Sequence, residues 1–366
     1  MKGKTRHYFA GGNTARGFYS LYETNLENLE KLFILKGGPG TGKSTLMKKL
    51  GLVWEERGVD VEYLHCASDA QSIDGIIFPT LKAGIVDGTP PHVIEPKAPG
   101  AVEEYVNLGT AWNSSQLGDK RENIVQLTEA IDIAYEQAYK LFAEALSVHD
   151  EWEEIYINNL DFAKLNQLTE KLMTNFFGEM VLNKTSDVRH RFLGAATPTG
   201  AVDYVPNLTT DIPKRFFLKG RPGSGKSTML KKLAAEGKRR GFDVEIYHCG
   251  FDPNSLDMVI VRELGLAIFD STAPHEYFPS REGDEIVDIY KTAILPATDD
   301  IYAEEIKEIS ERYRSKMTAA TNYLSQAKEL HDKLEEIYIA AMDFEKINEI
   351  QKTIEDKMNQ IALQYQ

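Results

Sequence analysis

The chain has no run of about 18 apolar residues, so a membrane-spanning helix is not expected. It begins with MKGKTRH, which lacks the apolar stretch of a secretory signal. Cysteine is scarce as well: Cys66 and Cys249 are too few for a disulfide scaffold and are typical of a reducing compartment. These absences predict a cytoplasmic protein without a membrane partner.

Basic residues are outnumbered, because 42 Lys and Arg face 56 Asp and Glu and give a formal charge of -14. A broad nucleic-acid surface needs clustered Lys and Arg that neutralise phosphates. The charge therefore argues against nucleic acid as a partner, although a local basic groove is compatible with it. Disorder is not expected, because 366 residues with 42% hydrophobic content suffice for two domains with cores of their own.

The chain is an internal duplication. The segment FILKGGPGTGKST at residues 33–45 recurs as FFLKGRPGSGKST at residues 216–228, an offset of 183 that also pairs the two cysteines. The histidines fall in pairs too, which fits either a function or slow divergence of the halves. We expect two domains: residues 1–182 with a core at 1–118 and a helical arm at 119–177, and residues 183–366 with a core at 183–296 and an arm at 297–366.

Each core is expected to alternate strands with helices. In the first copy the expected strands lie at 7–9, 17–21, 32–35, 59–66 and 83–86, and in the second at 215–218, 244–249 and 266–269. Between them Leu46, Leu50 and Val53 recur at helical spacing, and Gly58 follows as a stop signal. This order predicts an α/β fold in which a parallel sheet is covered by helices on both faces.

Both arms lack glycine and proline, over residues 119–177 and from residue 297 onward, which favours long helices. Apolar residues of the second arm follow spacings of three and four, the seam of a helix that packs on another helix: Ile306, Ile309, Tyr313, Met317, Ala320, Leu324 and Ala327. Asp161 and Asp343 are expected to cap shorter return helices, so that each arm forms an antiparallel hairpin. An unbroken rod is the alternative.

The pattern G-x-x-x-x-G-K-[ST] occurs in each copy after an expected strand and before an expected helix. Glycines let successive N–H groups point at an anion, and the helix N-terminus adds a positive dipole. Lys43 and Lys226 are expected to reach the β- and γ-phosphates of a nucleotide. The expected nucleotide-binding residues are Gly37, Gly38, Pro39, Gly40, Thr41, Gly42, Lys43, Ser44 and Thr45, and Gly220, Arg221, Pro222, Gly223, Ser224, Gly225, Lys226, Ser227 and Thr228.

A magnesium ion held by the loop serine needs an acidic partner on a neighbouring strand. Asp87 and Asp270 each close an apolar strand 44 residues after the loop lysine, which is the Walker B position. An aspartate that merely opens a turn is the competing interpretation. The expected magnesium ligands are Ser44 and Asp87 in the first copy and Ser227 and Asp270 in the second.

The glutamate that often follows such an aspartate, where it polarises the attacking water, is absent. Gly88 and Ser271 occupy that position, so hydrolysis needs another organiser. We expect His92 and His275 to contact the γ-phosphate or orient water, with Asp69 and Asp252 as rival candidates. The expected catalytic residues are Lys43, Asp87, His92, Lys226, Asp270 and His275.

Two other repeated pairs have open interpretations. The adjacent residues His65 and Cys66 suggest a zinc site. Neighbouring residues of a strand point to opposite faces, however, so they do not readily close a tetrahedral site. A structural role at the strand end is preferred. The paired arginines Arg6 and Arg189 fit either a surface salt bridge or an arginine supplied to the γ-phosphate of the opposite copy.

The glycine loops and the Asp87 and Asp270 positions resemble those of the P-loop NTPase superfamily. Over essentially its whole length the chain also resembles a group of tandem P-loop bacterial ATPases that are sometimes labelled nucleotide-kinase-like. The likeness is carried by Phe192–Gly194, Lys219–Thr228 and His248–Pro253. It implies two sites that bind ATP, or another NTP, with Mg²⁺.

The expected function is that of a Mg-dependent ATPase or nucleotide switch in which the cores and arms change their arrangement. The alternative is a phosphotransferase that acts on a nucleotide or small molecule. A third class is a nucleotide-stabilised scaffold whose helical arms bind a protein partner. The choice between ATP and GTP is open, because such loops bind the phosphates and no guanine-reading motif is evident.

Overall fold

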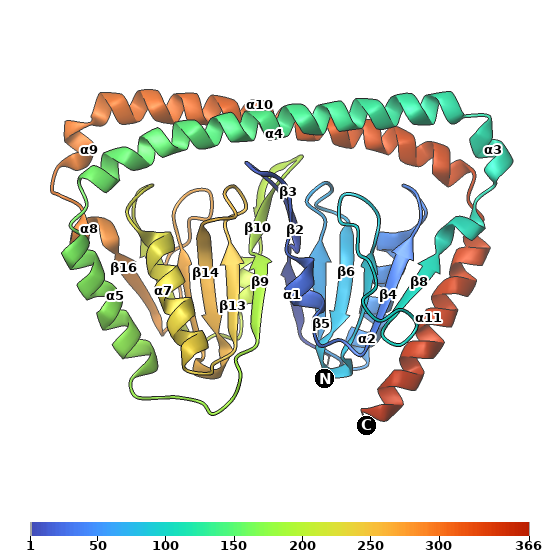
Figure 1. Cartoon of the computed structure of the whole chain (residues 1–366), viewed down its shortest axis with the longest axis horizontal. Helices are drawn as coiled ribbons and strands as arrows, with labels where there is room; N and C mark the ends of the chain where they lie inside the picture. Colours follow the sequence, from blue (N-terminus) through green and yellow to red (C-terminus); the bar gives the residue numbers. More distant parts are fainter. Residues whose placement is uncertain (1, 366) are drawn as a thin grey trace.

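The computed structural model describes residues 2–365; Met1 and Gln366, the outer ends of the two expected domains, lie outside them. The protein is mixed α/β, with two six-stranded sheets side by side beneath a pair of long helices (Figure 1). In the described part of the chain, no helix has both the length and the apolar character that crossing a lipid bilayer demands. The two repeats are related by an approximate two-fold arrangement in which each core is the counterpart of the other.

The sheet of repeat 1 has the strand order β1-β5-β6-β7-β4-β8. Its strands are β1 (Thr5–Tyr8), β4 (Lys31–Lys36), β5 (Val61–His65), β6 (Ile73–Phe78), β7 (Ala83–Asp87) and β8 (Glu103–Asn107). The expected parallel pairing is confirmed for β1–β5, β7–β4 and β4–β8 but is wrong for β6, which runs antiparallel to both β5 and β7. The loops at 66–72 and 79–82 are too short for the crossover that a parallel connection needs, so the chain reverses direction at each.

The sheet of repeat 2 repeats this topology in the order β16-β12-β15-β14-β13-β9. Its strands are β9 (Val188–Phe192), β12 (Lys214–Lys219), β13 (Val244–His248), β14 (Leu256–Val261), β15 (Leu266–Asp270) and β16 (Asp284–Asp288). Glycine loop 1, residues 37–44, joins β4 to helix α2 (Lys43–Glu56), and glycine loop 2, residues 220–227, joins β12 to helix α7 (Lys226–Arg239). The expected helix after each loop is therefore present.

Two hairpins link the repeats. They consist of β2 (Gly11–Thr14), β3 (Gly17–Ser20), β10 (Gly194–Thr197) and β11 (Gly200–Asp203), which form one four-stranded sheet in the order β11-β10-β2-β3. Phe9 and Phe192, equivalent positions of the two repeats, exchange main-chain hydrogen bonds of 3.0 and 2.9 Å. Below them, apolar residues of both repeats form one buried cluster that includes Leu64 and Phe217. The repeats thus share a core where they meet.

Short helices occupy the connections. They are α1 (Tyr22–Leu26), α3 (Ser114–Gly118), α6 (Val205–Leu208), α8 (Ile289–Ala293) and α9 (Thr298–Ile301), with 3-10 turns at Pro79–Leu81, Leu108–Ala111 and Arg262–Leu264. Among these, α3 and α9 lead from each core into its long arm helix, as Figure 1 shows.

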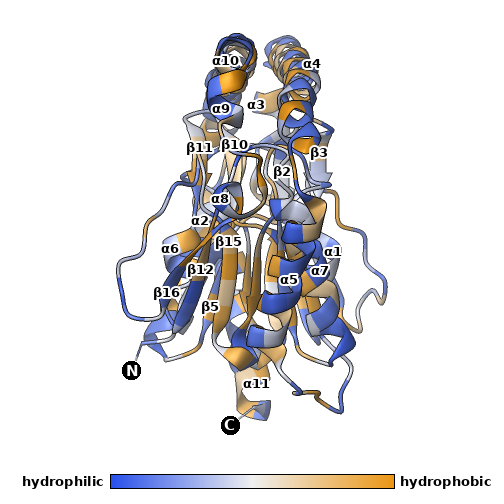
Figure 2. Ribbon diagram, turned by 90° about the vertical axis from the view of Figure 1, so that its left-hand side faces the viewer, coloured by the Kyte–Doolittle hydropathy of each residue, from blue (hydrophilic) through white to orange (hydrophobic). Residues whose placement is uncertain are grey.

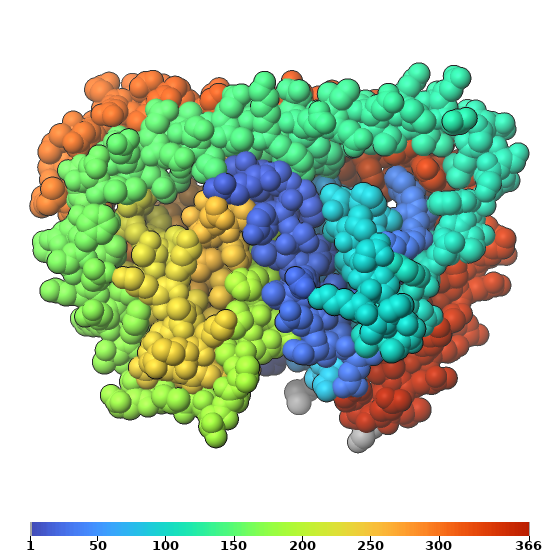
Figure 3. Space-filling model, viewed as in Figure 1, coloured from blue at the N-terminus to red at the C-terminus, as the bar shows by residue number. Residues whose placement is uncertain are grey.

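The long arm helices α4 (Arg121–Asn158) and α10 (Ala303–Ala340) lie side by side above both cores (Figures 1 and 2). They are antiparallel, as the ion pairs Glu144–Lys316 (2.7 Å) and Glu151–Arg312 (2.6 Å) show. The expected seam of the second arm is buried, since Ala320 and Leu324 pack against Ala138 and Phe142. Its partner, however, is the long helix of the other repeat. Figure 3 shows α4 spanning the upper ends of both cores.

The return helices α5 (Phe162–Phe177) and α11 (Phe344–Gln364) begin where expected, after the N-caps Asp161 and Asp343. Each long helix therefore turns into a shorter one, and the unbroken rod is excluded. The return helix does not fold back on its own long helix, because that helix has already used its apolar seam on the other arm. It descends along the core of the opposite repeat instead.

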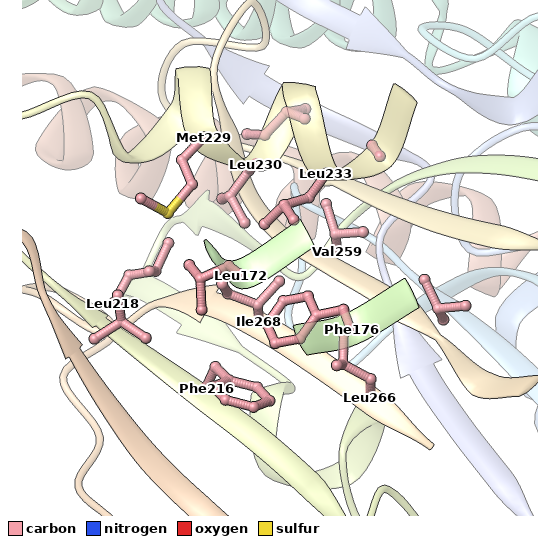
Figure 4. Close-up of a cluster of buried hydrophobic side chains, with 14 of the residues drawn as sticks. Leu172, Phe176, Phe216, Leu218, Met229, Leu230, Leu233, Val259, Leu266 and Ile268 are labelled. Carbon is pink, nitrogen blue, oxygen red and sulfur yellow. The ribbon is translucent and has the colours of Figure 1, made fainter. Parts of the chain in front are cut away.

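The return helix α5 completes the hydrophobic core of repeat 2. Leu172 and Phe176 lie among the buried side chains of the repeat 2 sheet and of α7, as the close-up shows (Figure 4). The ring of Phe176 is 4.6 Å from that of Phe216, centroid to centroid. In the same way Ile354 and Met358 of α11 join the core of repeat 1. Each packed unit thus consists of the core of one repeat and the return helix of the other.

Candidate functional site

The two glycine loops have the same backbone conformation. Gly40 and Gly42 have φ of 66° and 85°, and Gly223 and Gly225 have φ of 70° and 90°, a region that side-chain-bearing residues rarely occupy. Within the described residues, the N–H groups of these four glycines donate to no protein acceptor. Each loop runs into the first two residues of a 14-residue helix. Free N–H groups beside a helix N-terminus form a concave site for an anion.

The loop lysines lie inside the loops, next to the predicted acids. The Nζ of Lys43 donates to the carbonyls of Gly37 and Gly38, both at 2.8 Å, and lies 3.5 Å from Oδ2 of Asp87. In repeat 2 the corresponding distance, from Lys226 to Asp270, is 3.3 Å. The predicted lysine and aspartate of each repeat are therefore brought together.

The aspartates reach this position because β7 and β15 pair directly with the strands that precede the loops. Asp87 is in register with Leu35, the next-to-last residue of β4. Its Oδ1 accepts hydrogen bonds from the N–H and the hydroxyl of Thr89, at 2.9 and 2.6 Å, while Oδ2 faces Lys43. The aspartate thus opens a turn and faces the loop at once, so the two interpretations of this residue are compatible.

The remaining loop residues lie around this centre. Ser44 accepts a hydrogen bond of 3.1 Å from the N–H of Ile73, and Ser227 one of 3.0 Å from that of Leu256. The hydroxyls of Thr41 and Ser224 bridge their own loops through the carbonyls of residues 38 and 221. Thr45 and Thr228 are exposed in the first helical turns, and Pro39 and Pro222 are half-buried. The Arg221 side chain pairs with Asp299 at 2.7 Å.

The histidines of the prediction are tied to carboxylates. His92 is 6% exposed, and its Nε2 lies 3.4 Å from Oδ2 of Asp74. Burial lowers the pKa of His92, but the charge of Asp74 outweighs this effect and raises the pKa to about 9. His275 instead pairs with Asp203 at 2.9 Å. The equivalent of Asp203 in repeat 1 is Ser20, which has no carboxylate, so His92 lacks this partner. A contact of either ring with phosphate or water stays a prediction.

The sequence did not point to two further carboxylates of the site, Asp74 and Asp257. The register that pairs Gly75 with Val86 places Asp74, the preceding residue, beside Asp87. Its equivalent Asp257 lies in the same relation to Asp270: burial raises the pKa of Asp257 to about 6, and the Asp270 charge acts in the same direction. Each site therefore has a second, buried acid. The duplication offset pairs Asp74 with Asp257 and could have identified them.

The rival acids Asp69 and Asp252 lie on loops beside the sites. Asp69 caps its loop through the N–H of Gln71 at 2.9 Å and lies 3.6 Å from Lys328 of the opposite arm. Asp252 pairs with Arg16 of repeat 1 at 2.9 Å. Both acids therefore join one repeat to the other.

The paired arginines have salt-bridge partners. Arg6 lies 3.4 Å from Glu62, and Arg189 lies 2.8 Å from Asp187 and also donates to main-chain carbonyls. Both arginines therefore have a carboxylate partner, as the salt-bridge interpretation expects, but Glu62 is buried and the pair with Arg6 is not a surface one, while a role at the γ-phosphate of the opposite copy stays a prediction.

Both ring nitrogens of His65 have partners, at 2.9 Å each, in His7 and in the hydroxyl of Tyr204. Burial, followed by the charge of Asp74, raises the pKa of the neighbouring Cys66 thiol. No group of metal-ligand geometry in residues 2–365 includes His65 or Cys66. The structural role at the strand end is the one that the geometry supports.

The arm of the opposite repeat packs directly on each glycine loop. A methyl group on Gly38 would come within 2.8 Å of the Tyr338 ring, and one on Gly40 within 2.8 Å of the carbonyl oxygen of Glu335. In repeat 2, Gly223 has the same close contact with the main chain of Glu153. The presence of arm residues at the loops was not predicted from the sequence. The spacing of apolar residues shows that a helix is apolar on one face, but it does not show which core the helix crosses.

Comparison with protein-family models, curated proteins and solved structures gives no match to this chain. The chemistry of the site is therefore argued from its own residues. Main-chain N–H groups and an ammonium group suit a phosphate chain, and a hydroxyl with two carboxylates supplies the oxygen ligands that Mg²⁺ prefers. The residues present fit both groups.

Proposed function

We propose that the chain binds ATP, or another NTP, with Mg²⁺ at two P-loop sites and hydrolyses it, acting as an ATPase or nucleotide switch. The observation that carries this proposal is the pair of glycine loops with free N–H groups, each with its lysine 3.3–3.5 Å from an aspartate of the adjacent strand. The scarcity of cysteine supports a cytoplasmic location.

In this proposal each residue of the site has a distinct role. The N–H groups of glycine loop 1 bind the β-phosphate, and Lys43 moves from its contacts with the loop carbonyls to the β- and γ-phosphates. Ser44 and Asp87 hold the metal, with Asp74 beside them as a further oxygen ligand. Bound Mg²⁺ neutralises charge that develops on the phosphates during transfer. Glycine loop 2 does the same in repeat 2.

Titration calorimetry with Mg-ATP tests the binding. Wild-type protein should bind two equivalents, and Lys226→Ala should weaken one of them by about tenfold or more, because a charge-assisted contact to phosphate is lost. Asp270→Ala should retain ATP binding but remove the dependence of that site on Mg²⁺. Lys231→Ala, an exposed lysine on the same helix, serves as the control. Full-strength binding of two equivalents by the Lys226→Ala variant would contradict the proposal.

Turnover assays separate the function classes. Phosphate release without an added acceptor supports the ATPase. ADP production that requires a nucleotide or small-molecule acceptor would instead identify a phosphotransferase. Tight binding without turnover would identify a nucleotide-stabilised scaffold whose arms bind a protein partner.

A further inference from the structure

Each long arm helix carries a His-x-x-x-Glu pair at the point where it crosses the glycine loop of the other repeat. In α10 the pair is His331 and Glu335, with Nδ1 and Oε1 3.8 Å apart. In α4 it is His149 and Glu153, at the same distance. The main chain of each glutamate is the part of the helix that contacts the loop, against Gly40 and Gly223 respectively.

The lysine of the loop lies within electrostatic range of this pair. Burial lowers the pKa of His331, and the charge of Lys43 acts in the same direction. Burial likewise lowers the pKa of His149, with a further contribution from Lys226. The charge of each loop lysine therefore acts on the histidine of the opposite arm.

Each of the two glutamates is less exposed than the glutamate that follows it. Glu153 and Glu335 are half-buried, whereas Glu154 and Glu336 are exposed. Successive residues of an α-helix point about 100° apart, so the second glutamate of each pair lies on a different face from the one whose main chain contacts the loop. The chain offers a matched control at the next residue of each helix.

The position that often holds the water-polarising glutamate is occupied by Gly88 in repeat 1 and Ser271 in repeat 2. Resting on the proposed nucleotide sites, we propose that Glu335 activates the attacking water at the site of repeat 1 and that Glu153 does so at the site of repeat 2. Each site is then completed by the arm of the other repeat, and neither repeat is a catalytic unit alone.

The step conserves atoms and charge. The glutamate carboxylate accepts a proton from water while the water oxygen forms a bond to the γ-phosphorus. The bond from the γ-phosphorus to the bridging oxygen breaks, and its electron pair leaves with ADP. The protonated glutamate then returns its proton to the solvent or to the released phosphate. His331 and His149 position the carboxylates through the pairing seen on each helix.

Crossed variants test the assignment. In a Lys226→Ala protein only the site of repeat 1 is intact, and we expect Glu335→Gln to lower kcat about 100-fold or more with KM nearly unchanged, since only proton transfer is lost. In a Lys43→Ala protein the sensitive residue should be Glu153 instead. Glu336→Gln and Glu154→Gln should leave kcat unchanged in both backgrounds. Phosphate release measures turnover, and calorimetry measures binding.

The outcomes separate this inference from the proposed function. If kcat falls when the substituted glutamate lies in the same repeat as the intact lysine, the crossed assignment is wrong. If each single-lysine variant still binds and hydrolyses ATP at one site and no glutamate substitution lowers kcat, only the role of the glutamates fails. If wild-type protein binds no Mg-ATP, the proposed function fails and the inference fails with it.

Discussion

Arg191 lies at the contact between the repeats and stacks on Tyr8, which occupies the equivalent position in repeat 1. Its guanidinium carbon is 4.1 Å from the ring centroid of Tyr8, and its nitrogens lie 2.8 Å from Glu62 and 3.7 Å from Glu245. These two glutamates are themselves an equivalent pair. Arg191 therefore pairs with both acids, and each acid has a second arginine as well, Arg6 for Glu62 and Arg262 for Glu245.

Replacing Arg191 with Met should destabilise the protein by about 3 kcal/mol, because two buried carboxylates lose a shared partner. Urea unfolding at pH 7 measures the change. Adding Glu62→Gln should recover part of the loss, since one of the two carboxylates that lost Arg191 is then uncharged. A single substitution with no effect on the free energy of unfolding would contradict a structural role for this arginine.

The pairing of His92 with Asp74 makes stability depend on pH. The pKa of His92 rises from 6.5 to about 9 on folding, so its contribution is full below pH 6.5 and is lost as the pH rises through 9. The free energy of unfolding should fall by roughly 3 kcal/mol between pH 6.5 and pH 9.5. Urea titrations across this range measure it. Asp74→Asn should flatten the profile, and an unchanged slope in that variant would rule out the pair as its cause.

At this scale, local motifs identified part of the site. The glycines, the lysines and the strand-end aspartates of both repeats lie together as predicted, because the loop and the adjacent strand are fixed by short-range sequence. Asp74 was missed because it is followed by Gly75 within β6, which weakens the strand pattern. Glu335 was missed because no local rule connects residue 335 with residue 40.

Among the elements, the return helices have the clearest energetic consequences. Met358 of α11 is fully buried in the core of repeat 1, and Met358→Ala should cost about 2–5 kcal/mol. Leu363 of the same helix is 71% exposed, and Leu363→Ala should cost under about 0.5 kcal/mol. Urea unfolding compares the two variants.

Hydrogen exchange locates the effect of Met358→Ala. Exchange should rise in β4 and β7 of repeat 1, because these strands lie under α11, and not in β12 and β15 of repeat 2. A rise confined to β12 and β15 would mean that the return helix packs on its own repeat.

The elements were predictable to different degrees. Strands with continuous apolar sequence, such as β4 and β7, and the caps at Asp161 and Asp343 were located from sequence. Strand β8, with the sequence EEYVN, was missed because it is largely polar and only partly buried. Strand β6, with the sequence IDGIIF, was missed too, because Asp74 and Gly75 interrupt its apolar run.

For the whole molecule, the crossed return helices make the halves depend on one another. The linker after α5 crosses the surface, and Asn183 and Lys184 in it are exposed. A protease site inserted between them should be cleaved without separating the halves, because each half fills the core of the other. Size-exclusion chromatography with light scattering measures this. Halves that elute separately after cleavage would contradict the crossed packing.

The contact of Tyr8 with Arg191 also bears on how the protein arose. In an assembly of two identical chains, a position on the symmetry axis meets its own copy, so tyrosine would face tyrosine or arginine would face arginine. Unlike residues can occupy that place only when the two copies have different sequences, as the two repeats of this chain do. The contact of Tyr8 with Arg191 is therefore one that two identical copies could not make at that place, and it depends on the divergence of the two repeats.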